Sequence, residues 1–147
     1  MENTASRMKL RFDDIVVGAE IPALVQEKIT TQMLVEWAAA VRDFFPVHYD
    51  QNVAEKMGFP TVIVHGPLKC ALLARLMVQW IGEEGTLLEL TCEHRKSNLV
   101  EETLICKGKV SDKFEEKGCG YIRAEIWVEN DKGSKSAIGS SLVSLPL

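Results

Sequence analysis

An aspartate and a histidine suited to shared acid–base chemistry lie close together in the stretch D-F-F-P-V-H-Y-D, residues 43–50. On a continuous α-helix, Asp43 and His48 would point about 140° apart, because successive residues are about 100° apart around the axis. Pro46 disfavours a helical conformation of the residue before it, so we expect a helix to end just after Asp43. The chain can then fold back and bring His48 toward the Asp43 carboxylate.

Such a pair is chemically useful, because a carboxylate and an imidazole each favour the charged form of the other and histidine titrates near neutral pH. The alternative interpretation is structural: Asp43 ends one helix, His48 lies on the surface and Asp50 caps the next helix. The spacing alone favours this structural alternative.

A second polar segment, His65-Gly66-Pro67, precedes a long apolar stretch. Pro67 suits the first residue of a helix, whose free N–H groups and dipole attract negative charge. Gly66 permits close approach of a ligand to the backbone, so its N–H is a candidate donor to a developing oxyanion. Alternatively, Gly-Pro only begins the helix, and His65 orients the loop by hydrogen bonding instead of reacting.

The composition, 46% hydrophobic and 26% charged residues, fits one soluble domain spanning residues 1–147. The net charge of −4 and the lack of a run of basic residues argue against nucleic-acid binding. The N-terminus does not have the pattern of a signal peptide, and the apolar stretch 68–81 is too short to cross a bilayer. The predicted location is therefore cytoplasmic, without membrane contact.

The four cysteines share no C-x-x-C spacing, and three of them alternate with apolar residues in segments of strand periodicity. We expect small core residues that form neither a metal site nor disulfides. These cysteines are Cys70, Cys92, Cys106 and Cys119.

Three helices are indicated. Thr30 or Thr31 can cap a helix over residues 32–43, and a short helix is expected over residues 50–57. The third should run over residues 67–81, and its apolar side chains cover most of its circumference. A helix that is apolar nearly all round must be enclosed by other elements.

The rest of the chain can enclose that helix, because it alternates with the period of β-strands. Residues 17–29 favour a strand weakly, and four later segments favour strands joined by hairpin-like links at 113–118 and 130–133. An antiparallel sheet around a long helix, an α+β architecture, is therefore predicted. The residues expected to share the inward faces are Leu88, Leu90 and Cys92; Leu104, Cys106 and Val110; Ile122, Ala124, Ile126 and Val128; and Ile138 and Leu142.

D-F-F-P-V-H-Y-D, followed by A-E-K-M-G-F-P and V-I-V-H-G, resembles the MaoC-like hydratases and dehydratases, which include the (R)-specific enoyl-CoA hydratases. The family motif reads D-x-N-P-x-H, and Asp43, Pro46 and His48 match it in register. The likeness covers about residues 29–147 and is sharpest over residues 42–66. It implies a hotdog fold, in which an antiparallel sheet wraps around one long central helix.

By this resemblance, Asp43 and His48 form the catalytic dyad that orients and deprotonates water, and the N–H of Gly66 binds the thioester oxygen. The implied reaction adds water to a trans-2-enoyl-CoA and gives an (R)-3-hydroxyacyl-CoA, or runs in reverse as a dehydration. No cofactor and no metal are implied, since the CoA thioester is the substrate.

The sequence departs from the family pattern at four positions. Val41 and Arg42 replace small residues before the motif aspartate, Phe45 replaces the motif asparagine, and Ala74 stands where a supporting serine is often found. This form looks closer to acyl dehydratases that act on bulky acyl-CoAs, including steroid side chains, some of which work as unequal pairs. We therefore expect a homodimer or higher homo-oligomer, with a heteromer containing a second hotdog subunit as the alternative.

Three functions remain open at this point. The leading hypothesis is the hydro-lyase that uses Asp43 and His48. The second is a non-catalytic or accessory hotdog subunit, which the four departures favour and the intact dyad opposes. The third is an acyl-CoA thioesterase, for which the D-x-x-P-x-H pattern offers least support.

Further residues are candidates for substrate binding. The CoA phosphates need a basic patch, which Arg95 with Lys96, or Lys69, can supply. His65 is another candidate contact, whereas His94 is interpreted as a surface residue. Phe45 leads a group of aromatic residues that can line an acyl pocket, although such residues more often belong to the core; the others are Phe44, Phe59 and Trp80.

Overall fold

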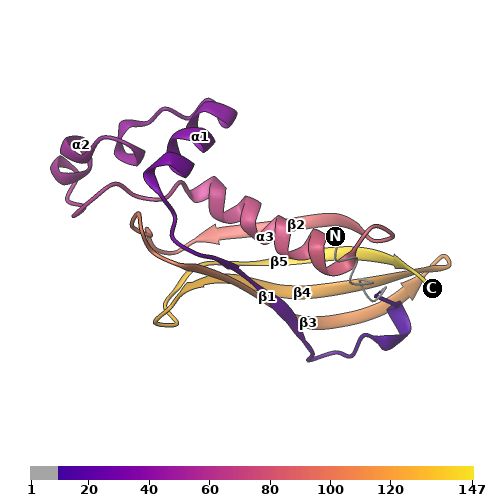
Figure 1. The fold of residues 1–147 in the computed structure, drawn as a ribbon. Helices are drawn as coiled ribbons and strands as arrows, with labels where there is room; N and C mark the ends of the chain where they lie inside the picture. Colours follow the sequence, from indigo (N-terminus) through magenta and orange to yellow (C-terminus); the bar gives the residue numbers. More distant parts are fainter. Residues whose placement is uncertain (1–9) are drawn as a thin grey trace, which may run out of the picture.

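The computed structural model describes residues 10–147 and contains a five-stranded antiparallel sheet with a long helix along one face (Figure 1). The strand order is β1-β3-β4-β5-β2. This hotdog fold confirms the α+β prediction. The strands are β1 (Glu20–Gln26), β2 (Thr86–His94), β3 (Leu104–Glu116), β4 (Cys119–Asn130) and β5 (Lys135–Pro146).

The three helices lie in the segments predicted for them, with differences of one or two residues at their ends. Asp50 caps α2, because its side chain accepts from the N–H groups of Asn52 and Val53. Thr30 caps α1 in the same way, by accepting from the N–H of Met33. Figure 1 shows α1 and α2 beyond the end of the sheet where α3 begins. The bounds are α1 (Thr31–Val41), α2 (Gln51–Lys56) and α3 (Gly66–Ile81), with 3-10 turns η1 (Phe12–Asp14) and η2 (Pro46–His48).

The hydrophobic core lies between α3 and the inner face of the sheet. Each large aliphatic side chain that leaves water here stabilises the fold by about 1.5–3 kcal/mol. From α3 the buried apolar residues are Leu68, Leu72, Leu73, Leu76, Met77 and Ile81, and they pack on Leu104, Cys106, Val110, Ile122, Ala124, Ile126 and Val128 of β3 and β4. The inward faces predicted for these two strands are therefore confirmed.

The prediction for β2 is wrong at Leu88, which is 46% exposed. The pairing with β5 shifts register between Leu87 and Glu89, so Leu88 occupies a bulge. Leu87, Leu90 and Cys92 pack against the core instead. A bulge of this kind changes the face of a residue without altering the alternation of residue types in the sequence.

The prediction for β5 is wrong by one residue. Ala137, Ser141, Val143 and Leu145 are buried and alternate along one face of the strand, and Ser136 is buried beside them, whereas Ile138 and Leu142 lie in the opposite register and are only half-buried. The inward row of β5 begins with small and polar residues, so the larger apolar side chains do not mark the core face. A one-residue shift in register moves every side chain of a strand to the other face.

The cysteines differ from one another in burial. Cys106 is buried as predicted, Cys70 and Cys92 are half-buried, and Cys119 is exposed at the start of β4. The core prediction is therefore wrong for Cys119. All four are free thiols.

No helix in the described part of the chain is long and apolar enough to cross a membrane. Residues 1–9, on which the expectation about a signal peptide depends, lie outside the described residues.

Lys69 is an unexpected member of the buried face of α3, with only 2% of its surface exposed. Its Nζ donates hydrogen bonds to the carbonyl oxygens of Lys96 at 2.7 Å and Ser136 at 3.3 Å. Burial lowers the pKa of Lys69, although Cys92 and Glu102 act in the opposite direction. The ammonium group thus joins α3 to the turn after β2 and to the start of β5, and it has little surface left for a CoA phosphate.

Replacing Lys69 with Met should remove a pH dependence of stability. Because the pKa of Lys69 in the folded protein is below its ordinary value of 10.5, the unfolded chain binds more protons between those two pKa values. Stability therefore rises with pH through this window in the wild type. The unfolding free energy of the wild type minus that of Lys69→Met should therefore rise toward pH 10.5. Urea unfolding at several pH values measures this difference.

Two thiols titrate in the same pH range, and their titration lowers the stability as the pH rises. Burial raises the pKa of Cys92 to about 11 and of Cys106 to about 12, and both remain in the variant. Their contributions largely cancel when the two proteins are compared. Lys96→Met, which removes an exposed ammonium, is the matched control, and a difference that stays flat with pH would contradict the assignment for Lys69.

Candidate active site

A short extended segment, residues 62–64, joins the elements that carry the candidate chemistry. On one side its main chain pairs with residues 98–100, with N···O distances of 2.9 and 3.1 Å. On the other side, the N–H of Ile63 donates to the carbonyl of Val47 at 3.3 Å. The segment leads directly into α3, so η2 and its His48 are held beside the first turn of that helix.

His48 is oriented by a main-chain carbonyl. Its Nδ1 lies 2.8 Å from the carbonyl oxygen of Ile63, and the residue is only 8% exposed. Because a carbonyl oxygen can only accept, Nδ1 carries the hydrogen in this bond. The neutral His48 ring therefore has its free lone pair on Nε2, where a proton can be accepted and later returned.

Asp43 follows a helix end that differs from the prediction. The helix α1 ends just before Arg42, which adopts the left-handed conformation with φ 58°, so it is shorter than the expected 32–43. Phe45 is extended, with φ −65° and ψ 121°, as expected of a residue that precedes Pro46. One carboxylate oxygen of Asp43 accepts from the Phe45 N–H at 3.3 Å.

The fold-back expected at Pro46 is confirmed. A carboxylate oxygen of Asp43 and a ring nitrogen each of His48 and His65 lie within 4.8 Å of one another. A water molecule about 2.8 Å from two such atoms, with a near-tetrahedral angle, separates them by about 4.6 Å. The upper bound of 4.8 Å on the distance between the Asp43 and His48 atoms includes this separation.

His65 is completely buried at the N-cap position of α3. Its ring stacks on that of His48, with centroids 3.7 Å apart and planes inclined by 21°. Its Nε2 lies 3.4 Å from the carbonyl oxygen of Asp43, and its Nδ1 is buried without a partner among the described residues. Burial, followed by the nearby His48, lowers the pKa of His65, whereas Asp43 acts to raise it.

The three side chains are of types that bind metal ions, but their geometry suits a metal poorly. Two imidazoles that share an ion must direct their lone pairs at one point about 2.0–2.1 Å away. The stacked rings of His48 and His65 are nearly parallel, so the in-plane lone pairs do not converge. One nitrogen of each ring is also engaged with a carbonyl oxygen.

Gly66 is the first residue of α3, and His94 lies against it. A methyl group added to Gly66 would be 3.0 Å from His94 Nε2 and 3.1 Å from its Cδ2. His94 is exposed as predicted, but the sequence did not indicate its proximity to Gly66, because the two are brought together only by the packing of α3 against β2. Burial lowers the pKa of His94, and Lys69 adds to the effect.

The other substrate-binding candidates fall into two places. Phe45 is 53% exposed, and its ring lies edge-on to His48 with centroids 6.3 Å apart. Arg95 and Lys96 lie in the turn that follows β2, where Arg95 pairs with Glu93 at 2.8 Å and Lys96 Nζ donates to the Ser134 hydroxyl at 3.0 Å. Of these three residues, Phe45 is the one in contact with the dyad.

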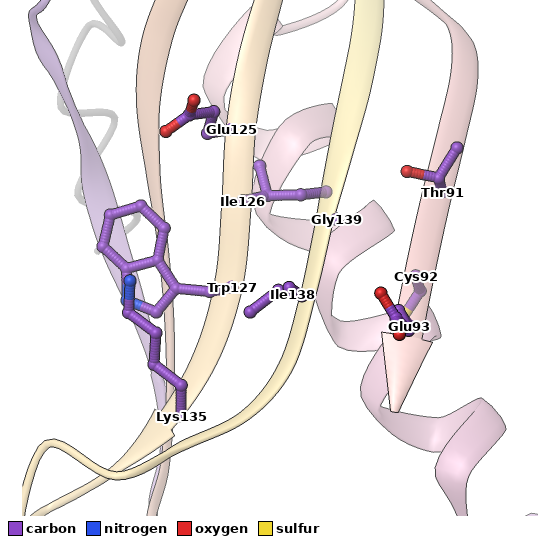
Figure 2. Close-up of a pocket in the computed structure, with 9 residues that line it drawn as sticks. All are labelled: Thr91, Cys92, Glu93, Glu125, Ile126, Trp127, Lys135, Ile138 and Gly139. Atoms are coloured by element: carbon purple, nitrogen blue, oxygen red, sulfur yellow. The ribbon is translucent and has the colours of Figure 1, made fainter. Parts of the chain in front are cut away.

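An open hollow of about 570 Å³ lies elsewhere, over β2, β4 and β5 (Figure 2). Figure 2 shows α3 behind the sheet, with Trp127 and Lys135 on the near side. The Lys135 ammonium already covers the indole ring, 4.3 Å from its centroid. None of the lining residues belongs to the Asp43–His48 cluster, so this hollow is separate from the candidate chemistry. They are Thr91, Cys92, Glu93, Glu125, Ile126, Trp127, Lys135, Ile138 and Gly139.

Solved structures with the same fold include several hydratases. The protein is similar to the (R)-hydratase from A. caviae involved in PHA biosynthesis, with a TM-score of 0.82, 23% identity and coverage of 90% of this chain and 98% of that one. It is also similar to the R-hydratase PhaJ1 from Pseudomonas aeruginosa, with a TM-score of 0.83, 23% identity and coverage of 92% and 84%.

A third similar structure is a subunit of the ChsH1-ChsH2 complex from Mycobacterium tuberculosis, with a TM-score of 0.77, 23% identity and coverage of 88% and 98%. No curated protein sequence matches the chain. The family model described as MaoC like domain matches residues 8–118, which include Asp43, His48 and Gly66. Because this match covers most of the chain, the protein belongs to the MaoC-like domain family.

Proposed function

We propose that the protein is a hydro-lyase that adds water to a trans-2-enoyl-CoA, or removes it from an (R)-3-hydroxyacyl-CoA. The observation that carries the proposal is the approach of the Asp43 carboxylate and a His48 ring nitrogen to within 4.8 Å of each other, beside the first turn of α3. The (R)-hydratase names of two proteins with the same fold support the same reaction class.

In the hydration direction, a water held between Asp43 and His48 loses a proton to one of them as its oxygen bonds to C3 of the enoyl group. The residue that took this proton then delivers it to C2, directly or through its partner in the dyad, so that the water is added across the double bond and both residues return to their starting protonation states. His48 can take either part through Nε2, because its Nδ1–H is already engaged with Ile63.

The N–H of Gly66 completes the proposed site. As electron density moves from the double bond to the thioester oxygen, that oxygen becomes enolate-like and gains from a donor at the end of a helix. Gly66 begins α3, so its N–H has no acceptor within the helix. A methyl-free Cα also leaves room for the oxygen beside the His94 ring.

The substrate contacts follow from exposure and charge. Phe44 and Phe45 are both more than half exposed, and Phe45 borders His48, so they can receive an acyl chain as it leaves the dyad. Arg95 and Lys96 are the proposed contacts for the CoA phosphates, since both are exposed basic residues in the turn that follows β2. An assay with acyl-CoAs of increasing bulk tests which chain lengths and rings the site accepts.

Assembly is proposed in two forms. The outer sides of β1 and β2 have no neighbouring strand in residues 10–147, so the sheet can be extended by a second copy or by another hotdog subunit. The similar structure from Mycobacterium tuberculosis is that of a complex, ChsH1-ChsH2. A homo-oligomer remains the first proposal, and an accessory role in such a complex is favoured by Phe45 in place of the motif asparagine.

Removing either member of the dyad should lower kcat/KM by about 10²–10⁴-fold, the usual contribution of one positioned acid or base. The variants are Asp43→Asn and His48→Gln, and the assay follows loss of the enoyl thioester absorbance over acyl-CoAs of increasing bulk. It is run with the protein alone and with any hotdog protein encoded beside it.

Asp50→Asn is the matched control for these variants, because asparagine caps a helix as well as aspartate does. Its rate should equal that of the wild type. If both dyad variants kept full activity in a complex, the protein would be an accessory subunit. Release of free CoA in place of hydration would identify a thioesterase.

Gly66→Ala should lower activity by at least about tenfold, because the added methyl group crowds both the His94 ring and the approach to the Gly66 N–H. The double variant with His94→Ala should recover any stability lost by Gly66→Ala, since the ring that meets the methyl group has been removed. A double-mutant cycle from urea unfolding measures this coupling. If Gly66→Ala changed the stability equally with His94 present and with His94→Ala, the His94 ring would be shown to move away from the methyl group without cost.

A further inference from the structure

We propose that His65 is a positioning residue, which holds the His48 ring and the Asp43 main chain in the geometry that the reaction needs. The inference rests on the proposed function. It replaces the substrate contact considered for His65 and extends the other interpretation, in which His65 orients the loop, to both members of the dyad. His65 is 0% exposed, so its side chain has no surface to offer to a substrate.

The first observation is the pair of contacts that His65 makes. Its ring lies flat on that of His48, with centroids 3.7 Å apart, and its Nε2 donates to the carbonyl oxygen of Asp43 at 3.4 Å. One side chain therefore touches both members of the dyad at once. The bond from His48 Nδ1 to Ile63 restricts rotation of the His48 ring within its plane, and the stack restricts its tilt.

The second observation is an unsatisfied nitrogen. Because Nε2 carries the hydrogen that Asp43 accepts, the neutral His65 ring has a lone pair on Nδ1, and this atom is buried without a partner among residues 10–147. Leaving a buried polar atom unpaired destabilises the folded protein. A phenylalanine would fill the same space without that cost, so packing alone does not account for a histidine here.

The third observation concerns charge. Burial and the adjacent His48 both disfavour a proton on His65, so its pKa is lowered and the neutral form of the ring is favoured. Two stacked imidazolium rings would repel each other, whereas a neutral ring tolerates a charged neighbour. A neutral His65 thus leaves His48 as the ring that gains and returns the proton.

The test separates the hydrogen bond from the packing. His65→Phe keeps a stacked ring and loses the Nε2–H bond together with the unpaired Nδ1, so the variant should be at least as stable as the wild type in urea. Its kcat should fall by about 10–100-fold, the usual effect of removing a group that orients a catalytic residue, with KM changed by less than about twofold. His65→Ala should lower kcat further, because both contacts are lost.

Tyr49→Phe is the matched control, since it removes another bond from a ring to a carbonyl of the same segment, the 2.9 Å bond from Tyr49 to Phe44. Its kcat should stay within about twofold of the wild type. An unchanged kcat in folded His65→Phe would overturn the proposal in favour of packing alone. A raised KM with unchanged kcat would overturn it in favour of a substrate contact.

A second measurement needs no activity and therefore distinguishes a failure of this proposal from a failure of the proposed reaction. Nitrogen-15 NMR of the wild-type histidines at neutral pH should show a neutral His65 with its hydrogen on Nε2 and a His48 with a hydrogen on Nδ1. A His65 that is charged, or protonated on Nδ1, would overturn the assignment whether or not the protein hydrates an enoyl-CoA.

Discussion

The candidate site depends on one hydrogen bond, from Nδ1 of His48 to the carbonyl oxygen of Ile63. That carbonyl is fixed from three directions, because residues 62–64 pair with residues 98–100, contact η2 through Val47 and continue into α3. The bond transfers the rigidity of the sheet and the long helix to an imidazole on a short turn. The bond determines the tautomer of His48 and, together with the stacked ring of His65, limits the position of the His48 ring.

The first turn of α3 concentrates nitrogen bases that burial holds toward their neutral forms. The pKa values of His65, Lys69 and His94 are all lowered, with loss of hydration as the leading cause in each. His65 directly precedes Gly66 and the His94 ring lies against it, at the point where the proposed reaction develops negative charge on an oxygen. An anion at that point would offset part of their cost of protonation, so the site is electrostatically better matched to an enolate-like oxygen than to a neutral carbonyl.

Features determined by neighbouring residues were predictable from the sequence, and features determined by distant contacts were not. Pro46 acts on Phe45 and the Asp50 cap acts on α2, both within a few residues, and both predictions are confirmed. The bulge at Leu88 and the ring of His94 over Gly66 arise from pairing and packing between separate elements. The burial of Lys69 likewise depends on carbonyl oxygens of Lys96 and Ser136, which no pattern around the lysine indicates.

Phe45 alters the polarity of the candidate site more than it alters the path of the main chain there. An asparagine at this position would offer an amide to the polar pair, whereas Phe45 presents the edge of an aromatic ring to His48 and leaves half of its surface exposed. An apolar wall beside a polar pair strengthens the electrostatics of that pair only when something excludes water from it. A bulky acyl group and a neighbouring hotdog subunit would both do so, and in each case the occupant that covers Phe45 also completes the active site.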